Sequence, residues 1–172
     1  MVLKKLFRPR PSEAAGRALY AAAVEQARTP ALYAGLKAPD TVEGRFELYS
    51  LHVLLLIERL RGEGTQAAET SQALFDTYAS SLDDALREMG VGDLSVGKKM
   101  RRLAEAFYGR AKSYDAASDR AGLEAFLQRT VYAGDGAAPV GGLADYVEAT
   151  RAHLAAQPLE PILAGEVRWP AI

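Results

Sequence analysis

FELYSLHVLLLIERLR, residues 46–61, is the most hydrophobic part of the chain, and the rest of the molecule must pack around it. It contains no glycine or proline, and its apolar side chains point to nearly every side of a helical projection. A buried strand could account for 51–57 alone, but the absence of a turn signal favours a helix from about Thr41 to Arg61. Because such a helix needs neighbours on several sides, we expect it at the centre of a helical bundle. Its strongly apolar run, 53–57, is far shorter than the ~20 residues that a membrane helix needs.

The flanking segments also show helical periodicity. The expected helices are 14–28 after an N-cap at Ser12, 66–89, a fifth helix from an N-cap at Ser95 to about Tyr114, 120–132 after a cap at Asp119, and 143–156, with one helical turn near Leu32 and Tyr33. The sequence therefore predicts an all-α fold, a single-domain helical bundle of about six to seven helices. We assign 1–11 to a basic N-terminal arm, 12–157 to the helical domain, and 158–172 to a Pro-containing C-terminal tail packed on that domain.

The segment 66–89 and the fifth helix are oppositely charged, since the exposed face of the first is acidic and that of the second is basic. Gly90 follows the first as a left-handed C-cap, so a short loop should join the two helices as an antiparallel pair whose charges attract. Their apolar stripes predict core positions at Leu74, Phe75, Tyr78, Leu82, Ala85, Leu86, Met89, Met100, Leu103, Phe107, Ala111 and Tyr114. A close helix crossing would explain Gly109 inside the fifth helix.

Composition excludes several classes of function. With 172 residues the chain is long enough for one domain of ordinary size. It carries 21 Lys+Arg and 22 Asp+Glu, a net charge of −1, so we expect no DNA partner held by bulk electrostatics. The arm has four basic residues and no acid, which leaves 17 basic against 22 acidic groups, or −5, for the rest. Zero cysteines and two histidines give little material for a metal centre, and we expect no cofactor.

Enzyme-like motifs are present, but their context is unfavourable. The segment from Gly92 to Lys98 resembles a phosphate-binding loop, yet Lys99 stands where a magnesium-binding Ser or Thr is required, and a helix rather than a strand precedes it. Ser95-Val-Gly-Lys98 lacks the other motifs of penicillin-interacting enzymes. His52 lies in the apolar helix, where a hydrogen-bonded core histidine is a better interpretation than a metal or haem ligand. We therefore do not expect an enzyme, although a nucleotide-using one is kept as a rival hypothesis.

Five runs of sequence resemble a known family. They are Gln26-Ala-Arg-Thr-Pro-Ala-Leu-Tyr33, Pro39-Asp-Thr-Val-Glu-Gly-Arg-Phe46, Leu51-His-Val-Leu54, Leu86-Arg-Glu-Met-Gly-Val-Gly-Asp-Leu-Ser-Val-Gly-Lys98 and Ala106-Phe-Tyr-Gly-Arg110. Across roughly residues 20–132 the chain resembles the ubiquinol–cytochrome c chaperone family, whose members are α-helical assembly factors for the cytochrome bc1 complex. The resemblance implies a non-catalytic chaperone that binds newly made apocytochrome b, with a possible ribosome contact. Because the N-terminal arm is not a persuasive transit peptide, we expect a bacterial-type rather than a mitochondrial member.

Candidate partner-binding residues lie in the connection between the two charged helices and on the basic residues near it. They are Arg45, Arg87, Glu88, Met89, Gly90, Val91, Gly92, Asp93, Leu94, Lys98, Arg101, Arg102 and Arg110. The alternative interpretation, which the sequence supports equally well, is an ordinary helical turn beside a solvated basic face. The basic face of the fifth helix also supports a rival function, a helical RNA- or ribosome-binding module.

The N-terminal arm is a candidate for weak peripheral membrane contact. Its basic and apolar side chains could hold it against anionic lipid, and the candidates are Lys4, Lys5, Leu6, Phe7, Arg8 and Arg10. The arm has no apolar h-region of a signal peptide and is not a persuasive transit peptide. We therefore expect a cytoplasmic protein, with peripheral contact at the inner face of the plasma membrane as a further hypothesis.

Overall fold

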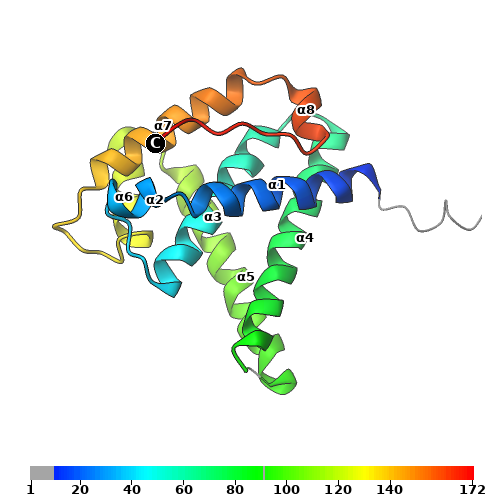
Figure 1. Cartoon of the computed structure of the whole chain (residues 1–172), viewed down its shortest axis with the longest axis horizontal. Helices are drawn as coiled ribbons and strands as arrows, with labels where there is room; N and C mark the ends of the chain where they lie inside the picture. Colours follow the sequence, from blue (N-terminus) through cyan, green and yellow to red (C-terminus); the bar gives the residue numbers. More distant parts are fainter. Residues whose placement is uncertain (1–9, 91) are drawn as a thin grey trace, which may run out of the picture.

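The computed structural model describes residues 10–90 and 92–172, and within these ranges the chain forms α-helices and no strand (Figure 1). The helices are α1 (Pro11–Ala27), α2 (Pro30–Ala34), α3 (Val42–Leu60), α4 (Thr65–Glu88), α5 (Asp93–Ala116), α6 (Arg120–Thr130), α7 (Val140–Ala156) and α8 (Leu159–Leu163). The all-α prediction is confirmed. The additional short helix is α8, which sequence periodicity could not reveal because it is one turn long and contains Pro161. No helix in the described ranges is both long and apolar enough to cross a membrane.

The hydrophobic segment forms α3 and lies at the centre, as predicted. Its first turn is capped by Thr41, whose hydroxyl accepts a 3.0 Å hydrogen bond from the backbone N–H of Gly44. From Glu47 to Leu56 every side chain except that of Tyr49 is buried. Neighbouring helices α1, α4 and α7 cover it on different sides. Since burial of a leucine-sized side chain contributes about 1.5–3 kcal/mol, this helix is the main source of core stability.

Two predicted N-caps are wrong, and one is right. Helix α1 begins at Pro11 with Arg10 as its N-cap, and α5 begins at Asp93 with Gly92 as its N-cap, so neither Ser12 nor Ser95 caps a helix. Proline suits the first helical position because it lacks the N–H that would be left without a partner there. By contrast, Asp119 caps α6 as expected, accepting a 2.7 Å bond from the N–H of Gly122.

The close crossing expected at Gly109 is found instead at Gly16. A Cβ atom on Gly16 would lie 2.6 Å from the backbone of Ala73 and Leu74, so α1 and α4 touch through their main chains there. A Cβ atom on Gly109 would meet nothing within 4 Å. Close helix packing therefore requires a glycine at position 16 of α1 and not at position 109 of α5.

The segment after α7 lies along the helical body beside α1 and α7 (Figure 1). The side chain of Gln157 accepts from the N–H of Arg168 at 2.9 Å and donates to its carbonyl at 2.8 Å. The ring of Trp169 packs edge-on against that of His52, with 5.2 Å between the ring centres. These contacts hold the final residues against the core.

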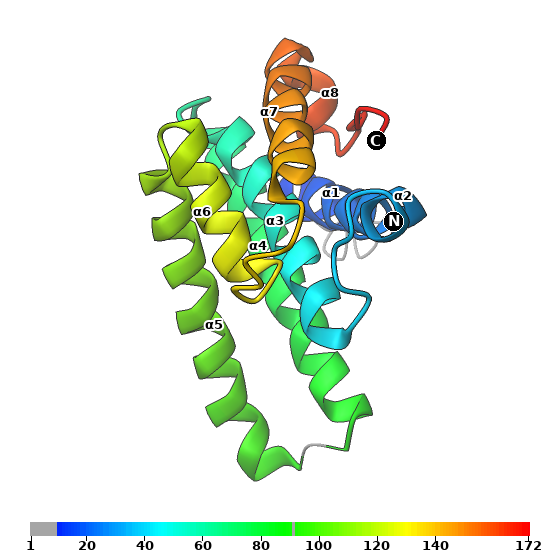
Figure 2. The same ribbon diagram turned by 90° about the vertical axis from the view of Figure 1, so that its left-hand side faces the viewer.

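Helices α4 and α5 form a hairpin whose end projects beyond the other helices (Figures 1 and 2). We call residues 82–103 the hairpin tip. Of the predicted core stripe, Leu74, Tyr78, Phe107 and Tyr114 are fully buried. At the tip, however, Leu82, Leu86, Met100 and Leu103 are only half-buried, and Ala85 and Met89 are exposed. The stripe is therefore a core stripe only where other helices reach it.

Candidate interaction surface

The connection between α4 and α5 forms the outermost part of the hairpin tip. Helix α4 ends at Glu88, Gly90 adopts the left-handed backbone with φ +81°, and α5 starts two residues after Val91. Val91 and the side chains of Asp93 and Leu94 lie outside the described part of the structure. Met89, by contrast, is a large apolar side chain that is 63% exposed. An isolated exposed methionine on a projecting turn is available for contact with an apolar partner.

We predicted that opposite charges on α4 and α5 attract each other, but the described ion pairs of these helices do not connect the two. Asp83 pairs with Arg87 of its own helix at 2.7 Å, and Asp115 of α5 pairs with Arg61 at 3.0 Å. In the hairpin tip Val96 is buried and Leu82, Leu86, Met100 and Leu103 are half-buried, whereas Lys98, Arg101 and Arg102 are exposed. In the described part of the hairpin, ring contacts of Phe107 with Phe75 and Tyr78 join α5 to α4.

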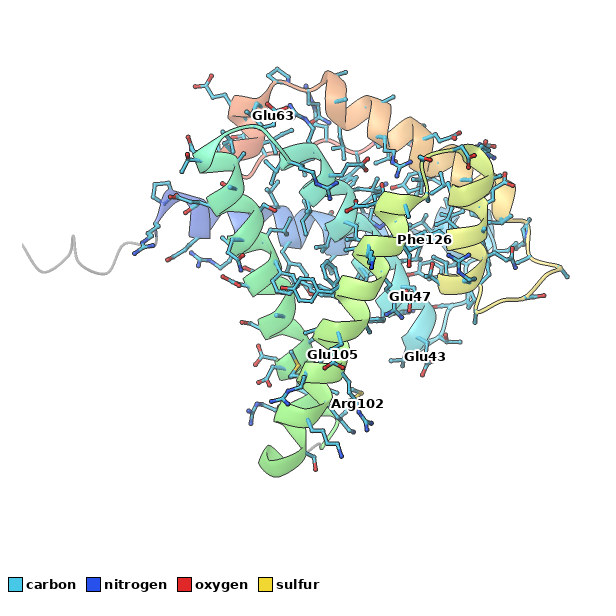
Figure 3. The ribbon with its side chains drawn as sticks, turned by 180° about the vertical axis from the view of Figure 1, so that it is seen from behind. Glu43, Glu47, Glu63, Arg102, Glu105 and Phe126 are labelled. Carbon is cyan, nitrogen blue, oxygen red and sulfur yellow. The ribbon has the colours of Figure 1, made fainter. Side chains whose placement is uncertain are left out.

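Arg110 is set apart from the other basic candidates because it is part of the packing. Its Nε donates to Glu47 Oε2 at 2.6 Å, a second bond joins Nη2 to Glu47 Oε1, and its guanidinium lies 5.2 Å from the centre of the Phe46 ring. Glu47 is only 9% exposed. Hydrogen bonding to this carboxylate raises the pKa of Arg110. In Figure 3 Glu47 lies beside α5, whereas Arg102 lies on the projecting part of the hairpin. Arg110 therefore ties α5 to α3, a role that a helical wheel of α5 alone does not show.

Arg45 is also separate from the hairpin tip. It lies in the first turns of α3, where its Nε donates to Asp40 at 2.6 Å and its guanidinium lies 5.8 Å from the centre of the Tyr33 ring. Both partners belong to the segment between α1 and α3. The structure thus divides the predicted basic residues among three places: the hairpin tip, the α3–α5 contact, and the beginning of α3.

An apolar hollow of about 400 Å³ opens between the C-terminal half of α3, the first half of α4 and the second half of α5. Its walls include Leu54, Ile57, Phe75, Phe107 and Tyr108. Tyr108 is 62% exposed although it contacts Phe75, with 5.5 Å between the ring centres. The sequence could have predicted this exposure from the adjacent aromatic residues Phe107 and Tyr108. Adjacent residues on a helix point about 100° apart, so both cannot face the core.

His52 is a core histidine, as predicted, and not a ligand. Its Nδ1 donates to the carbonyl of Leu48 at 2.7 Å, and its Nε2 accepts from the hydroxyl of Tyr146 at 2.8 Å. That hydroxyl in turn accepts from Gln26 at 3.0 Å, so one directional chain of hydrogen bonds crosses from α1 to α3. Complete burial lowers the pKa of His52 from 6.5 to about 4. Among the described residues no group of three or more His, Cys, Asp or Glu side chains is placed to hold a metal ion.

The sequence resembling a phosphate-binding loop has helical geometry. Gly92 is the N-cap of α5, Lys98 is exposed in its second turn, and the element before the turn is α4 rather than a strand. Of the arm residues, Lys4, Lys5, Leu6, Phe7 and Arg8 lie outside the described ranges. Arg10 is the exposed N-cap of α1, and its backbone N–H donates to the side chain of Glu13 at 3.2 Å.

Comparisons with known proteins agree on one family. A family model described as "Ubiquinol-cytochrome C chaperone" matches residues 34–169, which extends the likeness beyond the motifs into α7 and the final segment. The chain is 28% identical over 156 residues to "Ubiquinol-cytochrome c reductase complex assembly factor 1" of Mus musculus, and 27% identical over 156 residues to the Homo sapiens protein of that name. These alignments cover 88% of this chain but 53% and 52% of the relatives, so the chain spans about half their length.

A solved structure gives the same result at the level of the fold. The crystal structure of the Cbp3 homolog from Brucella abortus superposes with a TM-score of 0.86 and 34% sequence identity. The match covers 99% of this chain and 97% of that chain. The two proteins therefore share the same helical fold over nearly their whole lengths.

Proposed function

Because the chain belongs to the ubiquinol–cytochrome c chaperone family, whose named members are complex III assembly factors, we propose that it is a non-catalytic chaperone that binds newly made apocytochrome b and assists assembly of the bc1 complex. The observation that carries the proposal is the family match over residues 34–169. The identity of the client, apocytochrome b, is implied by the family resemblance alone. In this proposal residues 1–11 are an arm, 12–157 the chaperone domain and 158–172 a tail packed on it.

The apolar hollow beside Tyr108 supports a role in holding an apolar client. A membrane protein exposes apolar helices while it is being made, and an amphipathic groove is the usual way in which a soluble helical protein covers such a segment. Tyr108 and Met89 are large apolar side chains left exposed on the same hairpin. We place the client against this side of α5, with Tyr108 as its central contact.

The hairpin tip is proposed as the rim of that contact. Residues 87–90 and 92–94 lie at its end, and Lys98, Arg101 and Arg102 supply exposed positive charge beside it. Rim charges steer a partner and fix its register more than they add affinity. Arg110 acts in this scheme through its contact with Glu47, which sets the angle of α5.

Affinity capture from the native host, combined with deletion of the gene, tests the proposal. We expect cytochrome b to be recovered with the tagged chain, and bc1 content to fall in the deletion strain and to be restored by the intact gene. Normal bc1 content together with no recovery of cytochrome b would contradict it. A shortened chain without 1–11 that sediments with anionic vesicles as well as the full chain would remove membrane contact by the arm.

One observation favours a second candidate, an RNA- or ribosome-binding module. Lys98, Lys99, Arg101 and Arg102 place four exposed cations within two turns of α5. Binding through such residues would weaken steeply with salt, because each phosphate contact releases counterions. RNA affinity that is independent of salt, or absent, would exclude this candidate.

A further inference from the structure

Two of the family-like motifs meet at one place on the surface, at a distance from the hairpin along the chain. The run Gln26–Tyr33 supplies Arg28 and Tyr33, and the run Pro39–Phe46 supplies Asp40 and Arg45. Together with Tyr49 they form what we call the arginine–tyrosine cradle. Helix α2 and the connector after it fold back toward α3 to bring these residues together (Figure 2).

Both guanidinium groups of the cradle are held by tyrosines. Arg28 donates from Nε to the Tyr49 hydroxyl at 3.0 Å, and its guanidinium carbon lies 5.7 Å from the centre of that ring. Arg45 lies over the ring of Tyr33 in the same way, at 5.8 Å. Tyr33 is fixed by its own hydroxyl, which donates to the carbonyl of Ala27 at 2.7 Å. Such stacking orients an arginine without neutralising it.

The cradle has one positive charge in excess. Its two arginines face a single carboxylate, Asp40, which is bonded to Arg45 at 2.6 Å. Among the described residues Arg28 forms no ion pair; its described partner is a neutral hydroxyl. The Arg45–Asp40 pair is about half exposed on both sides, so it is weak and can rearrange. The groups border a hollow of about 370 Å³ whose apolar wall consists of Pro30 and Ala34.

We propose that the arginine–tyrosine cradle binds an aspartate or glutamate side chain from an acidic segment of a protein partner. One carboxylate supplies the single negative charge that the cradle lacks, and the free edge of the Arg28 guanidinium can hold it with two parallel hydrogen bonds. Pro30 and Ala34 suit the aliphatic stem of that side chain. This proposal does not depend on the client being apocytochrome b, because it concerns the chemistry of one contact.

The same geometry disfavours nucleic acid and phosphate monoesters. A guanidinium already lies beside each tyrosine ring, 5.7 and 5.8 Å from the ring centres, so a base that stacked on that side would have to displace it. A doubly charged phosphate would leave an excess negative charge beside Asp40. A protein carboxylate is therefore the ligand that the charge balance fits best.

Nuclear magnetic resonance of the full chain labelled with ¹⁵N-arginine tests the proposal. The probe is the peptide Ac-Ala-Glu-Ala-Glu-Ala-NH₂, its Gln-for-Glu analogue is the control, and inorganic phosphate is the third arm. We expect the Glu peptide to shift the Nε–Hε signals of Arg28 and Arg45 saturably, with a dissociation constant of ~1 mM, and the Gln peptide to leave them unchanged. Arg28→Gln should weaken binding at least about tenfold, and Arg28→Lys by less, because lysine keeps the charge but lacks the planar fork.

Arg17→Gln is the matched control, since Arg17 is an exposed arginine of α1, the helix whose C-cap is Arg28. It should leave binding unchanged. The absence of Glu-dependent shifts in the intact chain would overturn the proposal even if the variants could not be studied. So would equal binding by Arg28→Gln, or larger saturable shifts with phosphate than with the Glu peptide, which would assign the cradle to phosphate. Because these measurements do not involve cytochrome b, their failure is distinguishable from failure of the chaperone proposal.

Discussion

The body around α3 and the hairpin tip are built from the same kind of amphipathic helix, but the apolar stripe is buried in the body and only partly buried at the tip. In α4, Leu74 is fully buried against neighbouring helices, whereas Leu86, three turns later on the same helix, is half-buried at the tip. In α5, Phe107 is buried and the adjacent Tyr108 is 62% exposed. Periodicity tells which face of a helix is apolar, but only the presence of a neighbour decides whether that face is core or contact surface.

A large effect on stability is expected where the apolar stripe of α4 lies in the body, and a small one where it lies in the hairpin tip. Leu74→Ala should lower the free energy of unfolding by about 2–5 kcal/mol, because it leaves a cavity in a packed core. Leu86→Ala should cost only about 1 kcal/mol, because the side chain is already half in water. Urea unfolding of both variants measures the difference. Equal losses would mean that the tip is packed as tightly as the body.

The pH dependence of stability is expected to come from the body, through His52. Burial lowers its pKa from 6.5 to about 4, so the folded state favours the neutral imidazole. The resulting stabilisation is fully present above pH 6.5 and is lost as pH falls toward 4, with a total of about 3 kcal/mol. Urea unfolding at a series of pH values measures this loss.

A neutral replacement gives the control for that titration. His52→Gln has no group that titrates in this range, so its stability should fall less steeply between pH 6.5 and 4, although it starts lower. If the slope is the same in both proteins, other groups are responsible for the acid sensitivity.

Substitution of two glycines compares how closely the backbone is packed in the body and in the hairpin. Gly16→Ala should destabilise the protein by about 1–3 kcal/mol, because its Cβ would lie 2.6 Å from the backbone of α4. Gly109→Ala should instead stabilise it by up to about 1 kcal/mol, because the position is helical and open. Thermal unfolding distinguishes the two signs. A destabilising Gly109→Ala would contradict the exposed position of this part of α5.

Much of the body was predictable from residues alone, but contacts between residues far apart in the chain were not. The uniformly apolar α3 indicated its central position, and a lone histidine among leucines indicated a hydrogen-bonded core group. The partly buried Arg110–Glu47 pair was missed because its partners are 63 positions apart, and no local pattern encodes their contact. The sequence singled out the tip as a candidate contact, but it did not predict that the apolar stripe there is partly exposed, because that stripe has the same period as a buried one.

The positions of the N-caps were also only partly predictable from the sequence. Ser12 and Ser95 have the preferred side chains for N-caps, but the observed N-caps, Arg10 and Gly92, lie two and three residues earlier. Sequence preference at a helix end is worth about 1 kcal/mol, which a backbone constraint from proline or a turn can outweigh. The assignment of client contacts therefore has to start from exposure in the structure.

The smallest effect on stability is expected at Tyr108, where the effect on function should be large. Tyr108→Ser should change the free energy of unfolding by less than about 1 kcal/mol, because the ring is mostly in solvent. The neighbouring Phe107→Ala, which empties a buried site, should cost about 3–5 kcal/mol. If Tyr108→Ser retains stability but fails to restore bc1 content in the deletion strain, the exposed face of α5 has a role beyond folding. Full restoration would show that Tyr108 is dispensable.

Site-specific photocrosslinking during synthesis of cytochrome b tests the chaperone function and its surface together. A photoreactive residue at position 108 is compared with one at position 17, which is exposed on α1 away from the apolar hollow. We expect a crosslink between position 108 and newly made cytochrome b, and none from position 17. Crosslinking from position 17 but not from 108 would move the client to another face, and the absence of a crosslink to cytochrome b from either position would contradict the proposed client contact.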